Sequence, residues 1–201
     1  PISPNKLIIY GIGLVSGFIF SFIFIAVRYL LHNKITTVSE LEKLTNAPIL
    51  GAVPVTSDKM EFTKLVIDQS PKSAVSESLR SIRTNIEFML HSNHKRVISV
   101  TSTIGGEGKT FVSVNLGGII ALSRKKVLIL DLDMRKPRVH LSFSNKNSEK
   151  GMSTILINKH SYEESIEKTN IENLDYIPAG PTPPNPSELL LNGEFDNLIK
   201  R

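Results

Sequence analysis

A glycine-rich segment between two apolar runs carries residues suited to binding phosphate. Residues 99–110 read SVTSTIGGEGKT, in which an apolar strand pattern gives way to glycines and then to Lys-Thr at the start of a helical pattern. Backbone N–H groups in such a turn, together with a helix N-terminus, can converge on phosphate oxygens. We expect Lys109 to bridge the β- and γ-phosphates and the Thr110 hydroxyl to ligate Mg²⁺. The predicted ATP–Mg²⁺ loop comprises Thr103, Gly105, Gly106, Glu107, Gly108, Lys109, Thr110 and Phe111.

The loop departs from the strict phosphate-loop pattern at one position. That pattern places a glycine where this chain has Thr103, but Gly105 and Gly106 add glycines inside the loop. A dinucleotide-binding fingerprint does not fit, because its third glycine would fall on Phe111. The alternative is a surface glycine turn that precedes Lys-Thr by chance. The strand pattern before it and the helix pattern after it favour the phosphate loop.

A second set of charged residues follows another apolar run. Residues 126–131 read KVLILD, and Asp131, Asp133 and Arg135 then alternate along the chain. In an open α/β sheet, ligands bind at the carboxyl ends of the strands. Two carboxylates there could hold Mg²⁺ or accept a proton from an attacking hydroxyl, and Arg135 could contact phosphate or a partner. An aspartate cap or a solvated turn is the alternative. We expect Lys109, Asp131, Asp133 and Arg135 to be catalytic, with Thr110, Asp131 and Asp133 as Mg²⁺ ligands.

The surrounding patterns predict the elements that must position these residues. Near-continuous apolar runs predict buried strands at 96–102, 126–131 and 173–178, and residues 109–123 have a helical pattern. A further helix is expected from an N-cap at Ser70, with Pro71 at its first position. Strands alternating with helices indicate an α/β fold, a P-loop NTPase-type parallel sheet with helices on both faces. The expected apolar stripe of the 70–89 helix consists of Val75, Leu79, Ile82, Ile86 and Met89.

One long apolar segment precedes this domain. Residues 7–27 carry no charge, and a run of about 20 apolar residues is long enough to cross a bilayer. A signal peptide and a buried helix are the alternatives, but the run is long for the first and lacks the polar face of the second. Gly13, Gly17 and Ser21 could form a helix-packing face. Basic residues such as Arg28 and Lys34 after the span place its C-terminal side in the cytoplasm.

Composition narrows the classes of partner. The chain contains no cysteine, which excludes disulfides and Cys-ligated metals. Its formal net charge is +5, but the basic residues are scattered rather than gathered into a stripe. This distribution favours a solvated surface facing a membrane over nucleic-acid binding.

A short helix is expected between the apolar segment and the domain. The pattern Thr37-Val-Ser-Glu40 predicts a capping box that begins this helix, which extends to Leu44.

The two motifs together resemble those of a known family. An apolar run followed by D-x-D-x-R, after such a loop, resembles the second Walker motif of bacterial tyrosine kinases (BY-kinases). These kinases belong with deviant P-loop ATPases that include septum-site and plasmid-partition ATPases. Those ATPases carry a signature lysine where this chain has Ile104, which favours the kinase branch. The proline-rich stretch at 178–190 is similar to one in the family, and Pro1, Pro4 and the apolar span resemble the end of a chain-length-determinant (Wzz-like) domain.

The resemblance implies a function for the whole protein. It implies a membrane-anchored tyrosine autokinase that transfers the ATP γ-phosphate to tyrosines of a neighbouring subunit and regulates capsular or exopolysaccharide polymerisation and export. Asp133 would orient or deprotonate the tyrosine hydroxyl, and Asp131 is the alternative residue for this role. The helix with E-x-x-R-x-x-R would mediate ring-like homo-oligomerisation, although a simple ion-pair face is the alternative. The implied location is the bacterial inner membrane, with the P-loop domain in the cytoplasm. The residues of that helix motif are Glu77, Arg80 and Arg83.

The expected organisation has four parts: the end of an extracytoplasmic segment at 1–6, a transmembrane helix at 7–31, a juxtamembrane linker at 32–69 and the N-terminal part of a kinase domain at 70–201. The family's D-x-x-P strand (Walker B) and tyrosine-rich tail are not in the sequence, so we expect a fragment that is itself inactive or binds poorly. Tyr162 is expected on the surface and Tyr176 in the core. Two other functions stay open, namely a non-kinase ATPase switch at the membrane and a polysaccharide co-polymerase scaffold with a degenerate kinase domain.

Overall fold

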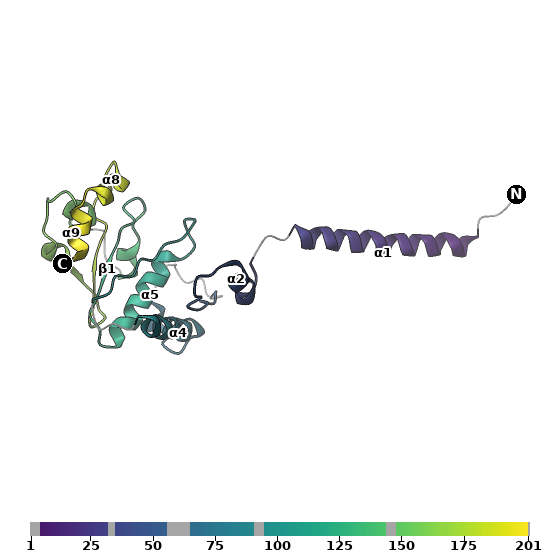
Figure 1. The fold of residues 1–201 in the computed structure, drawn as a ribbon, viewed down its shortest axis with the longest axis horizontal. Coiled ribbons are helices and arrows are strands. Elements are labelled where there is room, and N and C mark those ends of the chain that lie inside the picture. The colour runs from purple at the N-terminus through teal and green to yellow at the C-terminus, as the bar shows by residue number, and fades with distance from the viewer. Residues whose placement is uncertain (1–4, 32–34, 56–64, 91–94, 144–147, 201) are drawn as a thin grey trace. The chain divides into compact units, whose positions relative to one another are not determined.

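The computed structural model describes residues 5–31, 35–55, 65–90, 95–143 and 148–200 (Figure 1). The chain divides into two compact units, Pro1–Ile49 and Leu50–Arg201, which we describe separately. Pro1, Pro4 and Lys34, named above for their sequence context, lie outside the described residues.

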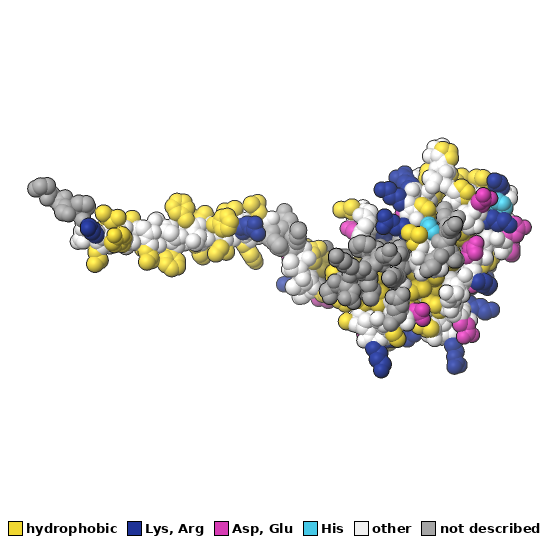
Figure 2. All heavy atoms as spheres, turned by 180° about the vertical axis from the view of Figure 1, so that it is seen from behind, with side chains coloured by type: hydrophobic (Ala, Val, Ile, Leu, Met, Phe, Trp, Pro, Cys, Tyr) yellow, Lys and Arg dark blue, Asp and Glu magenta, His cyan; other side chains and the backbone are white. Residues whose placement is uncertain are grey.

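The first unit contains one long apolar helix and one short helix. Helix α1, Lys6–Leu30, has 25 residues and is long and apolar enough to cross a membrane. Figure 2 shows apolar side chains along the whole length of this helix. Helix α2, Val38–Leu44, begins as expected, because the Thr37 hydroxyl accepts a hydrogen bond from the Glu40 N–H. The Glu40 carboxylate accepts from the Thr36 N–H rather than closing the expected box on Thr37.

The sheet of the second unit is mixed rather than purely parallel. Strands β1, Val127–Leu130, and β3, Leu174–Ile177, pair in parallel, as the sequence predicted. The short strand β2, Glu167–Lys168, pairs antiparallel with β3, which gives the order β1-β3-β2. No sequence signal marks β2, because a two-residue strand has no periodicity.

The expected strand at 96–102 is absent from the described structure. Residues 96–102 are assigned to no strand, and the side chains of Val97 and Ile98 are 67% and 44% exposed. An apolar run becomes a strand only where a neighbouring chain satisfies its N–H and C=O groups. The prediction was therefore wrong for this segment, which leads into the phosphate loop without forming a strand.

Helices cover both faces of the sheet, as predicted. Helix α5, Lys109–Leu122, packs on the face that presents Ile129 and Tyr176, and α6, Val139–Ser142, packs on the same face. Gly117 of α5 lets the helix approach Ile129, since a Cβ there would lie 3.0 Å from the Ile129 Cδ1 atom. The opposite face contributes Leu128 and Ile177 to another apolar cluster. This cluster includes residues of α7, Met152–Ile155, α8, Pro186–Leu191, and α9, Glu194–Lys200.

Helices α3, Val66–Gln69, and α4, Ala74–Met89, pack against α5. The N-cap of α4 is Ser73, whose hydroxyl accepts from the Ser76 N–H, and not Ser70 as expected. Ser70 instead offers its carbonyl to the Ser73 N–H, so residues 71 and 72 form a turn before the helix. The predicted stripe is buried except for Met89, which lies in the last turn and is 49% exposed.

A short segment of chain lies across α4. The Leu50 carbonyl accepts a hydrogen bond of 2.7 Å from the Asn85 amide, and Leu50 and Val53 pack on the cluster around α4. Gly51 between them has a φ of +156°, and a Cβ there would lie 2.7 Å from Ile82. This segment, Leu50 to Val53, is called the strap below.

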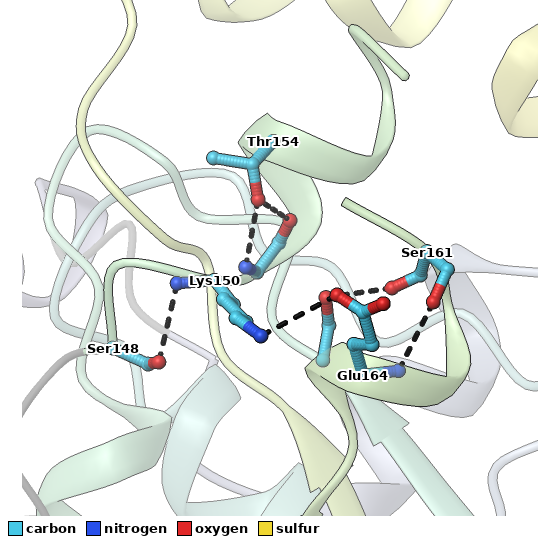
Figure 3. Close-up of polar contacts among 7 residues, drawn as sticks. Ser148, Lys150, Thr154, Ser161 and Glu164 are labelled. Atoms are coloured by element: carbon cyan, nitrogen blue, oxygen red, sulfur yellow. Dashed lines mark hydrogen bonds and ion pairs between the residues drawn. The ribbon is translucent and has the colours of Figure 1, made fainter. Parts of the chain in front are cut away.

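Helix α7 and the loop after it are held by a chain of polar contacts (Figure 3). The Thr154 hydroxyl accepts from the Gly151 N–H and donates to the Gly151 carbonyl. The Lys150 ammonium reaches the Glu164 carboxylate of η1, Glu163–Ser165, at 3.4 Å. The Ser161 hydroxyl accepts from the Glu164 N–H. These contacts fix the start of α7, which lies against the end of β3.

Candidate functional site

Two glycines of the phosphate loop have backbone conformations that favour glycine. Gly106 and Gly108 have φ values of +92° and +97°, a region that other residues adopt only with strain. Gly108 is the N-cap of α5, and Lys109 and Thr110 form the first turn of that helix. A Cβ built on Gly105, Gly106 or Gly108 would meet nothing within 4 Å. Conformation, not crowding, therefore requires glycine at 106 and 108.

The start of α5 presents backbone donors. The first hydrogen bond of the helix runs from the Val112 N–H to the Gly108 carbonyl, at 2.9 Å. The N–H groups of Lys109, Thr110 and Phe111 precede that bond, so they have no acceptor within the helix. Because α5 has 14 residues, its dipole adds partial positive charge at this end. The arrangement suits a phosphate group.

The direction of α5 brings this loop to the carboxyl end of the strands. Val114, near the start of the helix, packs with Val139 and Tyr176. Gly117 and Gly118, further along, approach Leu174 and Ile171, which lie at or before the start of β3. The helix therefore runs antiparallel to β1 and β3. Its N-terminus and the end of β1 lie at the same edge of the sheet, as the motif order predicted.

Asp131 is the buried acid at that edge. It follows β1 directly and is 4% exposed. One carboxylate oxygen accepts from the Asp133 N–H at 3.1 Å, and the other accepts from the Val139 N–H at 3.3 Å. Burial raises the pKa of Asp131 to about 6, against the lowering effect of these backbone hydrogen bonds. A bound cation would favour the charged form that burial disfavours.

Asp133 and Arg135 lie in a different environment. Both side chains are exposed, and one Asp133 oxygen accepts from the Lys136 N–H at 3.1 Å. The two acids that the sequence analysis assigned together to Mg²⁺ therefore differ in burial, since Asp131 is buried in the core and Asp133 is exposed to solvent. In the described part of the chain, no group of three or more acidic, His or Cys side chains gathers as a metal site.

Sequence reasoning missed the contribution of the loop after β3. The Met152 and Ser153 N–H groups donate to the Pro178 and Ala179 carbonyls, so the start of α7 is bonded to this loop. Gly151 makes the approach possible, because a Cβ there would lie 2.4 Å from the Pro178 carbonyl oxygen. Met134, between Asp133 and Arg135, is buried against the same cluster. A glycine before a short apolar helix was the available signal.

The helix motif on α4 forms ion pairs within its own unit. Arg80 pairs with Glu77, and the Arg83 Nε atom lies 4.0 Å from the Glu87 carboxylate. Glu87 also accepts from Lys125 at 2.8 Å, and this hydrogen bond is the main reason that the pKa of Glu87 is lowered. Arg83 and Glu87 therefore help to join α4 to the segment before β1. Glu77 and Arg80 lie further toward solvent.

The fold and the site together define a P-loop domain of the α/β class. Residues 95–183 match the family model described as an AAA domain. The putative tyrosine-protein kinase CapB of Staphylococcus aureus is 42% identical over 141 residues, which cover 70% of this chain and 61% of CapB. The chain thus spans less than two thirds of the length of that relative.

Solved structures agree with the sequence comparison. The BceF tyrosine kinase domain superposes with a TM-score of 0.74 at 32% sequence identity. The superposition covers 83% of this chain and 71% of that domain. The chimerical protein CapA2B2 superposes with a TM-score of 0.69 at 38% sequence identity. That superposition covers 82% of this chain and 69% of the CapA2B2 chain. The chain belongs to the bacterial tyrosine-protein kinase family.

Proposed function

We propose that the protein is a membrane-anchored tyrosine autokinase that uses ATP and Mg²⁺. The observation that carries the proposal is the glycine loop, with two positive-φ glycines before a 14-residue helix, at the same sheet edge as the buried Asp131. Phosphoryl transfer requires the phosphates to be positioned and their charge neutralised more than it requires covalent chemistry. Backbone donors, a lysine and buried carboxylate oxygens are suited to both tasks.

Each residue has a proposed role. The N–H groups from Gly105 to Phe111 bind the phosphates, and Lys109 bridges the β- and γ-phosphates. The Thr110 hydroxyl and Asp131, with Asp133 as a further acid, are oxygen donors of the kind that Mg²⁺ prefers. Mg²⁺ bound there would neutralise charge on the phosphates.

The two acids suit different tasks. Both oxygens of Asp131 already accept backbone hydrogen bonds, which fix this side chain at the end of β1. Asp133 is exposed and held by one N–H, so it is more accessible to an incoming tyrosine hydroxyl. We therefore assign Asp133 to orienting or deprotonating that hydroxyl, and Arg135 to contacts with phosphate or the partner segment.

The remaining parts of the proposal concern the setting of the reaction. Helix α1 would anchor the chain in the bacterial inner membrane, with the second unit in the cytoplasm. Glu77, Arg80 and Arg83 of α4 would contact a second copy in a ring-like oligomer, which the exposure of Glu77 supports. The similarity to CapB, named as a tyrosine-protein kinase, and to the chimerical protein CapA2B2 is consistent with a kinase of this kind. The polysaccharide polymerisation and export machinery is the proposed partner, and nucleic acid is not.

The test is the substitution Lys109→Met in the full-length protein. We expect the variant to lose ATP binding and tyrosine phosphorylation, as measured by isothermal titration and by phosphotyrosine mass spectrometry. Lys159→Met removes an exposed lysine away from the loop and should behave as the wild type. Unchanged phosphorylation in Lys109→Met would refute the kinase function. Nucleotide hydrolysis by the wild type without phosphotyrosine would favour an ATPase switch instead.

A further inference from the structure

The backbone of Ile104, at the first bend of the phosphate loop, is held by a side chain on each side. Its N–H donates to the Glu107 carboxylate, with 3.2 Å between N and Oε2. Its carbonyl accepts from the Ser102 hydroxyl at 2.8 Å. The Ile104 side chain is 67% exposed, so apolar packing does little to hold the residue. Two hydrogen bonds to side chains therefore fix the backbone at this bend.

A carboxylate is an unexpected side chain inside a phosphate loop. Like charges repel, so Glu107 opposes the approach of a nucleotide whose phosphates are negative. Among the ion pairs between described residues, Glu107 takes part in none that could neutralise it. The Ile104 N–H is the hydrogen-bond donor that the structure gives it. A role for the side chain has to come from that bond.

We propose that Glu107 is a positioning residue, which holds the loop in its nucleotide-ready shape through the Ile104 N–H and does not itself contact the nucleotide. The inference rests on the proposed nucleotide-binding function. Three glycines make the loop flexible, and ordering such a segment on binding weakens affinity. The bonds from Glu107 and Ser102 order the bend beforehand. The loop amides that follow are then already arranged when phosphate arrives.

The charge of Glu107 and its hydrogen bond act in opposite directions, which allows a decisive test. Removing a negative charge near phosphates should tighten binding, whereas removing the bond to Ile104 should weaken it. Glu107→Gln keeps an acceptor oxygen and loses the charge, and Glu107→Ala loses both. We expect the Kd for ADP to rise about tenfold in Glu107→Ala, in the range expected for a lost charge-assisted hydrogen bond. Glu107→Gln should bind as tightly as the wild type or more tightly, most clearly at low salt.

The experiment uses the complete chain in detergent and titrates ADP, first without Mg²⁺ and then with it. The loss in Glu107→Ala should persist without Mg²⁺, because the proposed bond involves the loop backbone alone. Ser102→Ala should raise the Kd about threefold and keep the wild-type salt dependence, since no charge changes. Glu172→Ala removes an exposed carboxylate before β3 and is the matched control. All variants should melt at the wild-type temperature, because the loop is exposed.

Three outcomes would overturn the inference. Glu107→Ala could bind ADP as tightly as the wild type or more tightly, which would show that only the charge matters. Glu107→Gln could be as weak as Glu107→Ala, which would show that the acceptor oxygen does not rescue binding. The loss could appear only with Mg²⁺, which would assign Glu107 to the cation. A wild-type chain that binds no ADP would instead overturn the proposed function, and this inference with it.

Discussion

The buried Asp131 makes a quantitative prediction about stability and pH in the nucleotide-free, Mg²⁺-free protein. Its pKa is raised from 3.8 to about 6 in the folded chain, mainly by burial. Between those two values the folded state binds a proton that the unfolded state releases, so this group makes the protein more stable as the pH falls from 6 towards 4. A pKa about 2 units higher in the folded state than in the unfolded state means that, at neutral pH, the charged carboxylate lowers the free energy of unfolding by about 3 kcal/mol.

The substitution Asp131→Asn removes this titration. At pH 7.5 the variant gains about 3 kcal/mol, because an amide, like the protonated acid, places no charge in the buried site. At pH 4 the folded wild-type carboxyl is itself protonated, so little of this gain remains. The difference in unfolding free energy between variant and wild type should therefore change by about 3 kcal/mol across this range.

Urea denaturation at several pH values measures this difference, and the comparison with wild type cancels the titration of other carboxylates. Asp196→Asn, at an exposed position on α9, is the control and should show a nearly constant difference. A constant difference for Asp131→Asn would refute the reasoning, because Asp131 would then be as well solvated in the folded state as in the unfolded one. Saturating ATP with Mg²⁺ should reverse the sign at pH 7.5 if the carboxylate binds the cation.

Two further substitutions test the contacts that position the site. Gly151→Ala should lower the free energy of unfolding by about 3 kcal/mol, because its Cβ would lie within 2.8 Å of backbone atoms of Pro178 and Gly180 that cannot move freely. The control Gly105→Ala has open space around its Cβ and should change stability by less than about 0.5 kcal/mol in the same denaturation assay. Asn85→Ala should cost about 0.5–1 kcal/mol and expose the strap to limited proteolysis, since the amide that holds the Leu50 carbonyl is lost. A Gly151→Ala variant as stable as the wild type, or a strap cut no faster in Asn85→Ala, would contradict these two contacts.

Local signals were enough to predict most of the elements around the site. The helix at 109–123, the strand after Lys126 and the strand before Pro178 are each marked by a long apolar pattern with clear ends. The position of Asp131 at the carboxyl end of β1 follows from the strand pattern alone. Tyr176 is buried in the core, as expected, and Tyr162 is half-buried against the apolar cluster around α7 rather than fully on the surface.

The features that sequence reasoning missed depend on contacts between distant segments. Whether residues 96–102 form a strand depends on a neighbouring chain, which an apolar run cannot report. The choice of Ser73 over Ser70 as the cap of α4 depends on a turn at 71 and 72, where proline fits as well as it would inside the first turn of a helix. The close approach of Gly151 to Gly180 joins residues on either side of η1, β2 and β3. No local pattern encodes such a contact.

The two sides of the candidate site are held by different kinds of interaction. Asp131 is fixed by the core, since it follows β1 directly, accepts a hydrogen bond from the N–H of the buried Val139, and precedes the buried Met134. The phosphate loop is exposed and is fixed by two side-chain hydrogen bonds and two positive-φ glycines. Substitutions near Asp131 should therefore change stability and binding together, whereas substitutions at Ser102 and Glu107 should change binding alone. This difference is why the loop, and not the acidic edge, is the part of the site where affinity for the nucleotide can vary without unfolding the domain.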